Sequence, residues 1–370
     1  MRLMAAALMA ALWLTAPAAA DELRIATAGP LSGPQAMFGI TWQNGMQMYV
    51  DEVNAAGGAN GRTVALVAHD DKADPDEGVL VARKLCDDPA TLAVIGHFNS
   101  GVVRATLPVY GECGMPSVFT GSNPTLTQLG FANVFRPIAN DFIQGGLSAG
   151  YARTTLHANK AAVVHDGQVF GQGVADIFTA SFQNGGGEIT SLSAIAPAED
   201  DFRTLIAEIK AQSPDVVYLG AVMPQLALFA RQMREQELAA RLLLPDGAYT
   251  REFIDQAGTA AAEGAIVSFQ VPPARATPAL AAFADAYRAR FGAEVGPYSI
   301  FGYVFAQIVI EGIRTAATLD RAGLIAALRS IRLDTAVGPI AFDATGELMT
   351  APVFLYEVAG DGFKLVASSQ

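Results

Sequence analysis

Residues 92–127 read LAVIGHFNSGVVRATLPVYGECGMPSVFTGSNPTLT and contain the same construction twice. Each copy begins with a short apolar run, first 93–96 and then 117–119. Both runs are too brief for a helix, and their β-branched residues favour a buried strand. Small polar residues follow each run, at 99–101 and at 120–124. The stretch therefore predicts two strands that each lead into the start of a helix.

These two helix starts are expected to form an anion site. Pro124 suits the first position of a helix capped by Ser122 or Asn123. If the strands are parallel neighbours, both helices begin at the carboxyl edge of the sheet, where open α/β sheets bind ligands. Each helix dipole would stabilise an anion by roughly 0.3–1 kcal/mol, and hydroxyls of Ser100 and Ser122 would add hydrogen bonds. A small carboxylate is the expected ligand, although either loop alone is also explained by helix capping.

The chain begins with a predicted secretory signal peptide, residues 1–20. Arg2 is followed by an apolar stretch to Leu14 and by three alanines at 18–20. No later segment reaches the roughly 18 uninterrupted apolar residues of a spanning helix, so we expect export to the periplasm without membrane insertion. The formal charge is 24 minus 36, or -12. Such an acidic protein repels nucleic acid and anionic lipid.

Alternating strands and helices predict an α/β fold with two parallel sheets. The alternation begins at residue 23 and restarts near residue 140, as expected for right-handed βαβ units. Removing 20 of the 370 residues leaves 350, more than one core usually supports, so two domains are expected. The strands expected in the second half are 160–165, 188–194, 215–220, 241–244 and 264–269.

Cys86 and Cys113 are the two cysteines of the chain. Neither belongs to a CxxC pair, and two thiols without a nearby pair of histidines make a poor zinc site. Each lies near the end of a predicted helix, and consecutive crossover helices on one face of a sheet would bring these ends together. A structural disulfide is therefore favoured, although spacing alone does not establish its geometry.

Two motifs suggest chemistry but lack the context for it. Residues 146–150, GLSAG, match the GxSxG pattern of serine hydrolases. A nucleophile elbow needs a strand immediately before the serine, whereas 141–155 reads as one helix. The acidic residues between 70 and 77 lack the spacing of a calcium loop and read as a solvated turn followed by an acidic first helical turn. We predict no catalytic centre, metal site or cofactor.

What remains is a binding site. Aromatic residues at strand ends or loop tips could form the walls of an apolar pocket, namely Phe38, Phe98, Phe170 and Tyr298. Ordinary core packing explains each of them equally well. Asp141 and Asp246 could pair with an ammonium group, and surface or capping roles remain open for both.

Six segments together resemble the leucine/isoleucine/valine-binding protein family of periplasmic receptors. They span nearly the whole mature chain and read RIATAGPLSGPQAMFGI, HDDKADPDEGVLVARKL, AVIGHFNSG, GMPSVFTGSNPTLT, VVHDGQVFGQG and VGPIAFDATGEL. The resemblance implies a type I periplasmic binding protein with Venus-flytrap architecture, in which two doubly wound parallel-sheet lobes are joined by three hinge crossovers. The first lobe would be 21–139 plus 271–348, and the second 140–270 plus 349–370.

The same resemblance implies roles for individual residues. Ser100, Gly121 and Ser122 fall at the positions that hold an amino acid's α-carboxylate, and Asn99 lies in the same loop. The side-chain pocket is expected at the four aromatic residues named above, three in the first lobe and Phe170 in the second. Asp141 and Asp246 lie at acidic positions near the ligand amine. The sequence departs from the family pattern at two positions: Val222 stands where a tyrosine is expected, and Asp246 stands where a glutamate is expected.

The predicted function is a monomeric periplasmic receptor that delivers a ligand to the membrane permease of an ABC importer. An apolar amino acid, branched-chain or similar, is the expected ligand, held through its carboxylate while the hinge closes. A second hypothesis keeps the fold and replaces the ligand by an aromatic or aliphatic acid without an amine. A ligand-sensing receptor and a secreted GxSxG hydrolase are the alternatives of another class.

Overall fold

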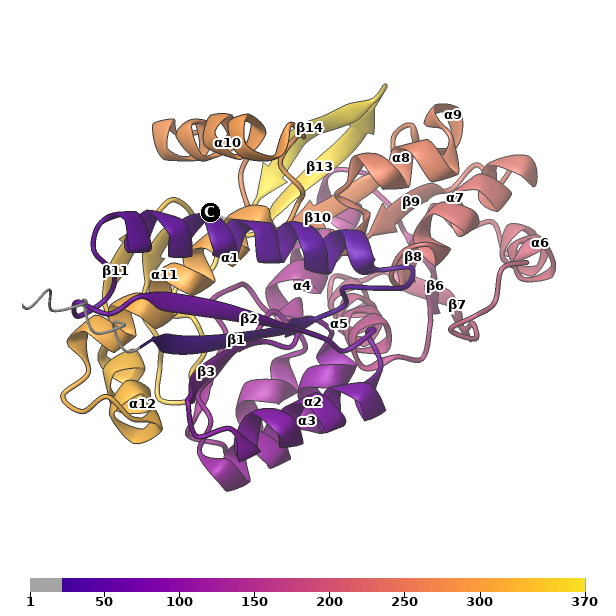
Figure 1. Ribbon diagram of the computed structural model, residues 1–370. Coiled ribbons are helices and arrows are strands. Elements are labelled where there is room, and N and C mark those ends of the chain that lie inside the picture. The colour runs from indigo at the N-terminus through magenta and orange to yellow at the C-terminus, as the bar shows by residue number, and fades with distance from the viewer. Residues whose placement is uncertain (1–21, 370) are drawn as a thin grey trace, which may run out of the picture.

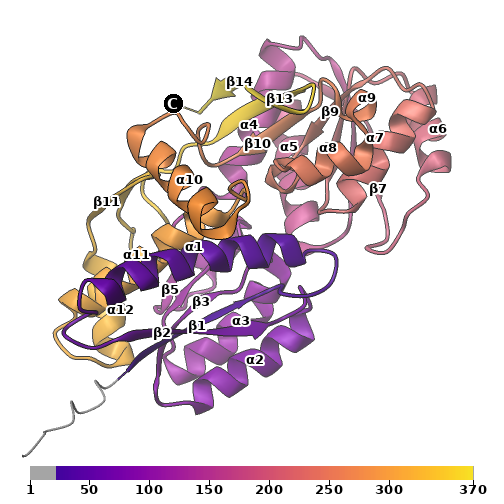
Figure 2. The same cartoon turned by 45° about the horizontal axis from the view of Figure 1, so that its top comes forward.

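Two β-sheets organise the chain into two α/β lobes that lie side by side (Figures 1 and 2). The computed structural model describes residues 22–369. The predicted signal peptide, residues 1–20, lies outside the described residues. Within the described part, no helix is long and apolar enough to cross a membrane.

The first sheet is parallel throughout, in the strand order β2-β1-β3-β4-β5. Its strands are β1 (Leu23–Gly29), β2 (Val64–Asp70), β3 (Thr91–Gly96), β4 (Ser117–Val118) and β5 (Val134–Phe135). The neighbouring helices α2 (Pro75–Asp87) and α3 (Ser100–Cys113) cover one face. The opposite face carries α1 (Ala36–Ala55), α11 (Ser299–Thr315) and α12 (Arg321–Ser330). Because β3 and β4 are parallel neighbours, their carboxyl ends meet at one edge, as predicted.

The second sheet has the order β14-β13-β10-β9-β8-β6-β7. Its strands are β6 (Lys160–His165), β7 (Glu188–Ala194), β8 (Val216–Gly220), β9 (Arg241–Leu244), β10 (Ile266–Phe269), β13 (Phe354–Ala359) and β14 (Gly362–Ser368). The helices of this part are α4 (Asp141–Thr154), α5 (Val169–Asn184), α6 (Arg203–Ala211), α7 (Gln225–Glu235), α8 (Arg251–Ala257) and α9 (Thr259–Ala262), with a short 3₁₀ turn η2 (Asp246–Ala248).

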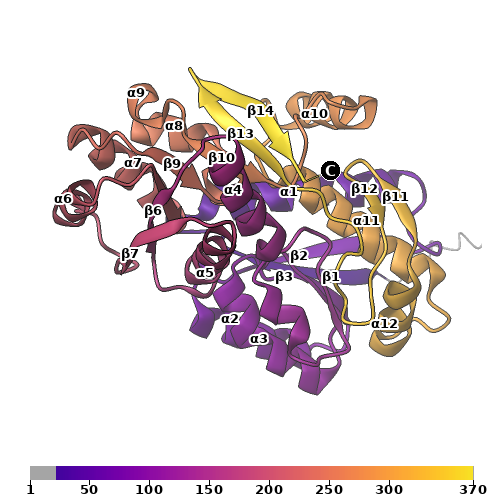
Figure 3. The same cartoon turned by 180° about the vertical axis from the view of Figure 1, so that it is seen from behind.

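The predicted parallel sheet is present in the second lobe, and an antiparallel pair of strands extends it at one edge. The strands β6 to β10 are parallel, but β13 pairs antiparallel with β10, and β14 pairs antiparallel with β13 (Figure 3). Gly360, with a positive φ of 60°, turns the chain back after β13, so β13 and β14 form a hairpin. The chain between β10 and β13 includes α10 (Pro278–Phe291) and a small hairpin of β11 (Leu333–Thr335) and β12 (Gly338–Ile340).

Helices α1 and α11 cross in close contact because each presents a glycine to the backbone of the other. A Cβ at Gly45 would lie 1.8 Å from the Ser299 carbonyl oxygen, and one at Gly302 would lie 1.9 Å from the Trp42 carbonyl oxygen. Neither helix accepts a side chain at this crossing. The contact brings the start of α1 next to the start of α11, and therefore Phe38 next to Tyr298.

Buried polar contacts anchor the chain where it passes between the sheets. Arg136, at the end of β5, is fully buried and pairs with Glu347, which precedes the last crossing into the second sheet. Nδ2 of Asn140, the N-cap of α4, donates to the same carboxylate over 3.2 Å. Two crossings that are distant in sequence are thus tied at one point.

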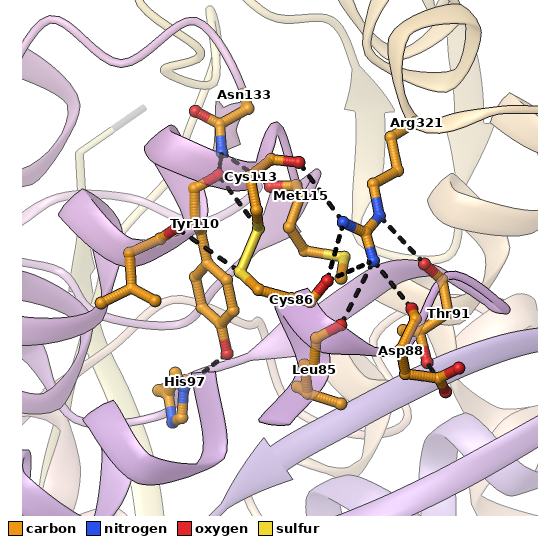
Figure 4. Close-up of a disulfide and its surroundings, with 11 residues drawn as sticks. Leu85, Cys86, Asp88, Thr91, His97, Tyr110, Cys113, Met115, Asn133 and Arg321 are labelled. Carbon is orange, nitrogen blue, oxygen red and sulfur yellow. Dashed lines mark hydrogen bonds between the residues drawn. A yellow bond between two sulfur atoms is a disulfide. The ribbon is translucent and has the colours of Figure 1, made fainter. Parts of the chain in front are cut away.

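The predicted disulfide between Cys86 and Cys113 is present (Figure 4). The Cα atoms are 5.7 Å apart, and the bond joins the ends of α2 and α3. The Arg321 guanidinium, at the start of α12, donates to backbone carbonyls of both cysteines and of Asp88. A cation at two helix C-termini complements their dipoles, so this corner holds α2, α3 and α12 together.

Candidate functional site

Two loops meet at the carboxyl edge of the first sheet, and main-chain contacts join them. The Thr120 N–H donates to the His97 carbonyl over 3.2 Å. The Asn123 N–H donates to the Ser100 hydroxyl oxygen over 3.3 Å. Ser100 and Ser122 are both buried, at 2% and 4% exposure. The loops after β3 and β4 therefore meet at one edge of the sheet, as the sequence pattern predicted.

Most of the predicted site residues line one cavity at this edge, which encloses about 440 Å³ of non-protein space, partly open to solvent. From the first sheet's side come Gln35, Phe38, Phe98, Asn99, Ser100, Thr120, Ser122 and Tyr298, and from the second come Phe170, Val222, Asp246 and Gly247. The cavity is therefore formed between the two lobes.

Only one of the two predicted helix dipoles is present at the site. Helix α3 begins at Ser100, as expected, but Pro124 begins the five-residue 3₁₀ turn η1 (Pro124–Gln128). Asn123 caps that turn by accepting from the Thr125 N–H. A single turn has no appreciable macrodipole, so the second loop contributes hydroxyl and main-chain groups instead.

The start of α3 keeps its donors available. Its N-cap, Asn99, makes no side-chain hydrogen bond to the helix and instead donates Nδ2 to Gln35 Oε1 over 2.8 Å. The N–H groups of a first helical turn have no partner within the helix. Two buried atoms of the lining, Asn99 Oδ1 and Thr120 Oγ1, also lack a partner. Groups of this kind suit a bound polar ligand.

Three aromatic rings form a packed wall of the cavity. The Phe98 and Tyr298 ring centroids are 4.8 Å apart, and those of Phe38 and Tyr298 are 5.5 Å apart, both edge-on. Phe38 and Phe98 are stacked at 6.1 Å. Phe170 and Val222 face the space from the second lobe. This part of the cavity is therefore mainly apolar.

Asp246 is the one carboxylate of the lining, which includes no Lys, Arg or His among the described residues. Its Oδ2 accepts from Gln270 Nε2 and from the Tyr298 hydroxyl, each over 3.0 Å. Burial raises the pKa of Asp246 against these hydrogen bonds. A buried carboxylate without a cation is a place where a positive ligand group gains most.

Gly121 and Asp141 are not among the lining residues. A Cβ at Gly121 would lie 3.2 Å from the Ser100 Cα, so this glycine packs beneath the loop. Asp141 is fully buried, its N–H donates to the Ser122 carbonyl over 2.9 Å, and its Oδ2 has no partner. Burial raises the pKa of Asp141 to about 7, and the charge of Asp246 adds to this shift.

A buried hydrogen-bonded triad supports the first loop from behind. His97 Nδ1 lies 2.7 Å from Asp71 Oδ2, and His97 Nε2 lies 2.9 Å from the Tyr110 hydroxyl. The reading of the acidic segment as a solvated turn is therefore wrong for Asp71, which is fully buried. Asp76 and Glu77 do lie in the first turn of α2, as expected, and Asp74 caps that helix. Residue type and spacing alone gave no sign that the histidine and this acid would meet.

Sequence reasoning also missed Gln35, Thr120 and Gly247 as lining residues. Thr120 lies within the polar run after β4, so its place at a strand end could have indicated it. Gln35 lies in a loop between β1 and α1 and carries no such signal. The rejected hydrolase motif has a simple explanation, because Ser148 lies inside α4 and donates to the Gln144 carbonyl.

Comparison with known proteins agrees with this architecture. Residues 22–363 match the model of the periplasmic binding protein family. The chain belongs to the periplasmic binding protein family. This periplasmic binding protein is 33% identical to an amino acid binding protein of Pseudomonas aeruginosa, over 96% of the chain and 95% of the relative. It is 34% identical to Leu/Ile/Val-binding protein homolog 2 of Brucella abortus, over 91% and 90%.

Solved structures show the same fold. A leucine binding protein of Thermotoga maritima superposes with a TM-score of 0.87 at 26% identity, covering 94% of this chain and 98% of that one. An R. palustris solute binding protein of an ABC transporter, in complex with benzoate, gives 0.84 at 23% identity, covering 94% and 96%. Periplasmic binding proteins are the substrate-binding components of ABC transporters and not enzymes, and the predicted membership of the leucine/isoleucine/valine-binding branch is confirmed.

Proposed function

We propose that this periplasmic binding protein delivers an apolar α-amino acid to the permease of an ABC importer. The observation that carries the proposal is that one cavity is lined both by donors suited to an anion and by a buried carboxylate suited to a cation. Donors gather at the start of α3, Asp246 lies on the second lobe, and an aromatic wall lies beside both. A zwitterion with an apolar side chain satisfies all three.

The carboxylate end is formed by the first lobe. Ser100 and Ser122 contribute hydroxyls, and the first turn of α3 contributes N–H groups and the positive end of its dipole. No cationic side chain lines the cavity within residues 22–369, so the carboxylate would be held by neutral donors.

The ammonium end is Asp246. A ligand ammonium beside this carboxylate supplies the missing positive charge and makes the charged form favourable. Asp246 is shorter than the glutamate expected from the family, but its 6% exposure and its place in the lining keep it accessible to a bound molecule.

Hinge closure follows from the same arrangement. The lobes are proposed as 21–139 plus 271–348 and 140–270 plus 349–370, with signal peptide 1–20 removed on export and the mature protein a periplasmic monomer. A ligand held by the first lobe favours the closed state only through the additional contacts that it makes there with the second lobe. Those contacts would come from Phe170, Val222 and Asp246.

An acid without an amine is the second candidate. It is favoured by Val222, which offers no hydrogen bond, and by the raised pKa of Asp246, because a protonated carboxyl would not repel an anionic ligand. The structural neighbour bound to benzoate has the same fold.

One screen separates the candidates. Thermal unfolding of the protein without its signal peptide would be followed with leucine, isoleucine, valine, 4-methylpentanoate and benzoate, since a ligand of the native state raises the midpoint. We expect the amino acids to raise it most. A shift with the amine-free acids and none with any amino acid would overturn the proposal and favour the second candidate.

A further inference from the structure

Gln144 is a buried amide that connects two acidic residues without touching the cavity. It lies in the first turn of α4 and is fully buried. Its Nε2 donates to Asp141 Oδ1 over 3.1 Å, and its Oε1 accepts from the Asp246 N–H over 2.9 Å. Oε1 also accepts from the Ser268 hydroxyl over 2.6 Å.

This network fixes the orientation of the Gln144 amide. Two donors, the Asp246 N–H and the Ser268 hydroxyl, face its oxygen, so its NH₂ group must face Asp141, which accepts. Reversing the amide would place donor against donor and acceptor against acceptor. Asp141 and Gln144 therefore act together as one oriented unit.

The unit contacts the main chain of Asp246. Asp246 begins the 3₁₀ turn η2 directly after β9, and no side chain caps that turn. Its main chain is held by Gln144, whereas its carboxylate is held by Gln270 and Tyr298. Removal of the Gln144 contact would leave the carboxylate hydrogen bonds and the bond from the Tyr249 N–H to the Asp246 carbonyl, but would free the Asp246 N–H.

We propose that Gln144 is a positioning residue that holds Asp246 for a ligand ammonium and so sets the preference for amino acids over acids without an amine. This inference rests on the proposed function, because it requires Asp246 to meet an ammonium. The Asp141 N–H also donates to the carbonyl of Ser122 on the first lobe, so the same unit connects the loop proposed to hold the ligand carboxylate with Asp246.

A double-mutant cycle tests the inference with leucine, by isothermal titration calorimetry. We expect Gln144→Met, which is similar in length but makes no hydrogen bond, to weaken leucine binding about tenfold. Because Gln144 acts through Asp246, Gln144→Met/Asp246→Ala should bind within about twofold of Asp246→Ala alone. Ser268→Ala removes another partner of Gln144 without touching Asp246 and should stay within about threefold of the unmodified protein.

A reversal of the hydrogen bond provides rescue. Gln144→Glu alone faces Asp141 with like charge and should weaken leucine binding at least tenfold. Adding Asp141→Asn returns a donor to the pair, and Asp141→Asn/Gln144→Glu should recover to within about threefold. If Gln144→Met does not unfold cooperatively, the comparison of Gln144→Glu with Asp141→Asn/Gln144→Glu still tests whether Gln144 positions Asp246.

The outcomes distinguish a failure of the proposed function from a failure of the role of Gln144. An unmodified protein that binds no amino acid contradicts the proposed function. Tight leucine binding together with additive losses in the cycle, or without rescue, overturns only the role of Gln144. Because 4-methylpentanoate lacks the amine, its affinity should change less than threefold in Gln144→Met, and an equal loss for both ligands would indicate a merely structural role.

Discussion

The Tyr298 hydroxyl donates to Asp246 Oδ2 over 3.0 Å and so joins the start of α11 to the turn after β9. Tyr298 packs on Phe38 and Phe98 of the first lobe, whereas Asp246 follows a strand of the second sheet. One hydrogen bond therefore spans the cleft and orients the carboxylate at the same time.

Tyr298→Phe tests this relationship directly. The ring and its aromatic contacts stay, and one hydrogen bond of about 1 kcal/mol is lost, so leucine affinity should fall roughly two- to tenfold. Loss of a contact across the closed cleft should appear mainly as faster dissociation in stopped-flow measurements. Unchanged dissociation would mean that Asp246 does not depend on this donor.

Asp246→Ala should weaken an amino acid ligand at least tenfold, about 1.4 kcal/mol. The reason is the loss of the single carboxylate of the lining. Ser100→Ala should cost less, because N–H groups of α3 remain to bind the carboxylate. Calorimetry on both variants checks the order, and an unaltered affinity in Asp246→Ala would remove this residue from the site.

A second contact across the cleft joins Asn123 Nδ2 to the Val169 carbonyl over 2.8 Å. A Cβ at Gly173 would lie 2.3 Å from that same nitrogen. We therefore expect Gly173→Ala to hinder closure and weaken ligand binding about threefold. The shorter Asn123→Ser, which keeps a capping oxygen, should make the alanine harmless, so the double variant should bind like Asn123→Ser alone. A further loss in the double variant would show that the clash lies elsewhere.

Asp141 should make the ligand-free protein less stable as pH rises. Its pKa is about 7 in the folded protein against an ordinary 3.8, so between these values the folded state retains a proton that the unfolded state has lost. The free energy of unfolding then falls by about 1.36 kcal/mol per pH unit. Asp246, also raised by burial, acts in the same direction.

The matched variant is Asp141→Asn, which cannot titrate. Urea unfolding at pH 5 and pH 7 should show a decline in the original protein that exceeds the decline in the variant by roughly 2–3 kcal/mol. Equal declines would assign the pH dependence to other groups.

Much of the fold could be predicted because each element carried its own local signal. The strands expected at 160–165, 188–194 and 241–244 have the bounds of β6, β7 and β9. Short or edge elements were harder: β5 has two residues, and β14 has mixed exposure without an apolar core face. A proline at Pro124 correctly indicated a helical start, but not that the helix would end after one turn.

The residues of the site also divide into those with a local sequence signal and those without one. Ser100 and Ser122 were predictable because strand ends and caps have sequence signatures. Gln144 and Asp71 were not, since their roles depend on partners 102 and 26 residues away, respectively. A residue that acts through another leaves no local pattern.

The joint of Arg136, Asn140 and Glu347 has a practical consequence. It ties two crossings together, and Arg136 also donates to the carbonyls of Gly121 and Asn123, so an opening of the lobes would alter the surroundings of the chain just after Glu347. Met349 lies there with 64% exposure and is not among the lining residues. A fluorescent dye attached at Met349→Cys should change its emission when a ligand binds. The labelled protein would then serve as an optical sensor in which the cavity residues are unchanged.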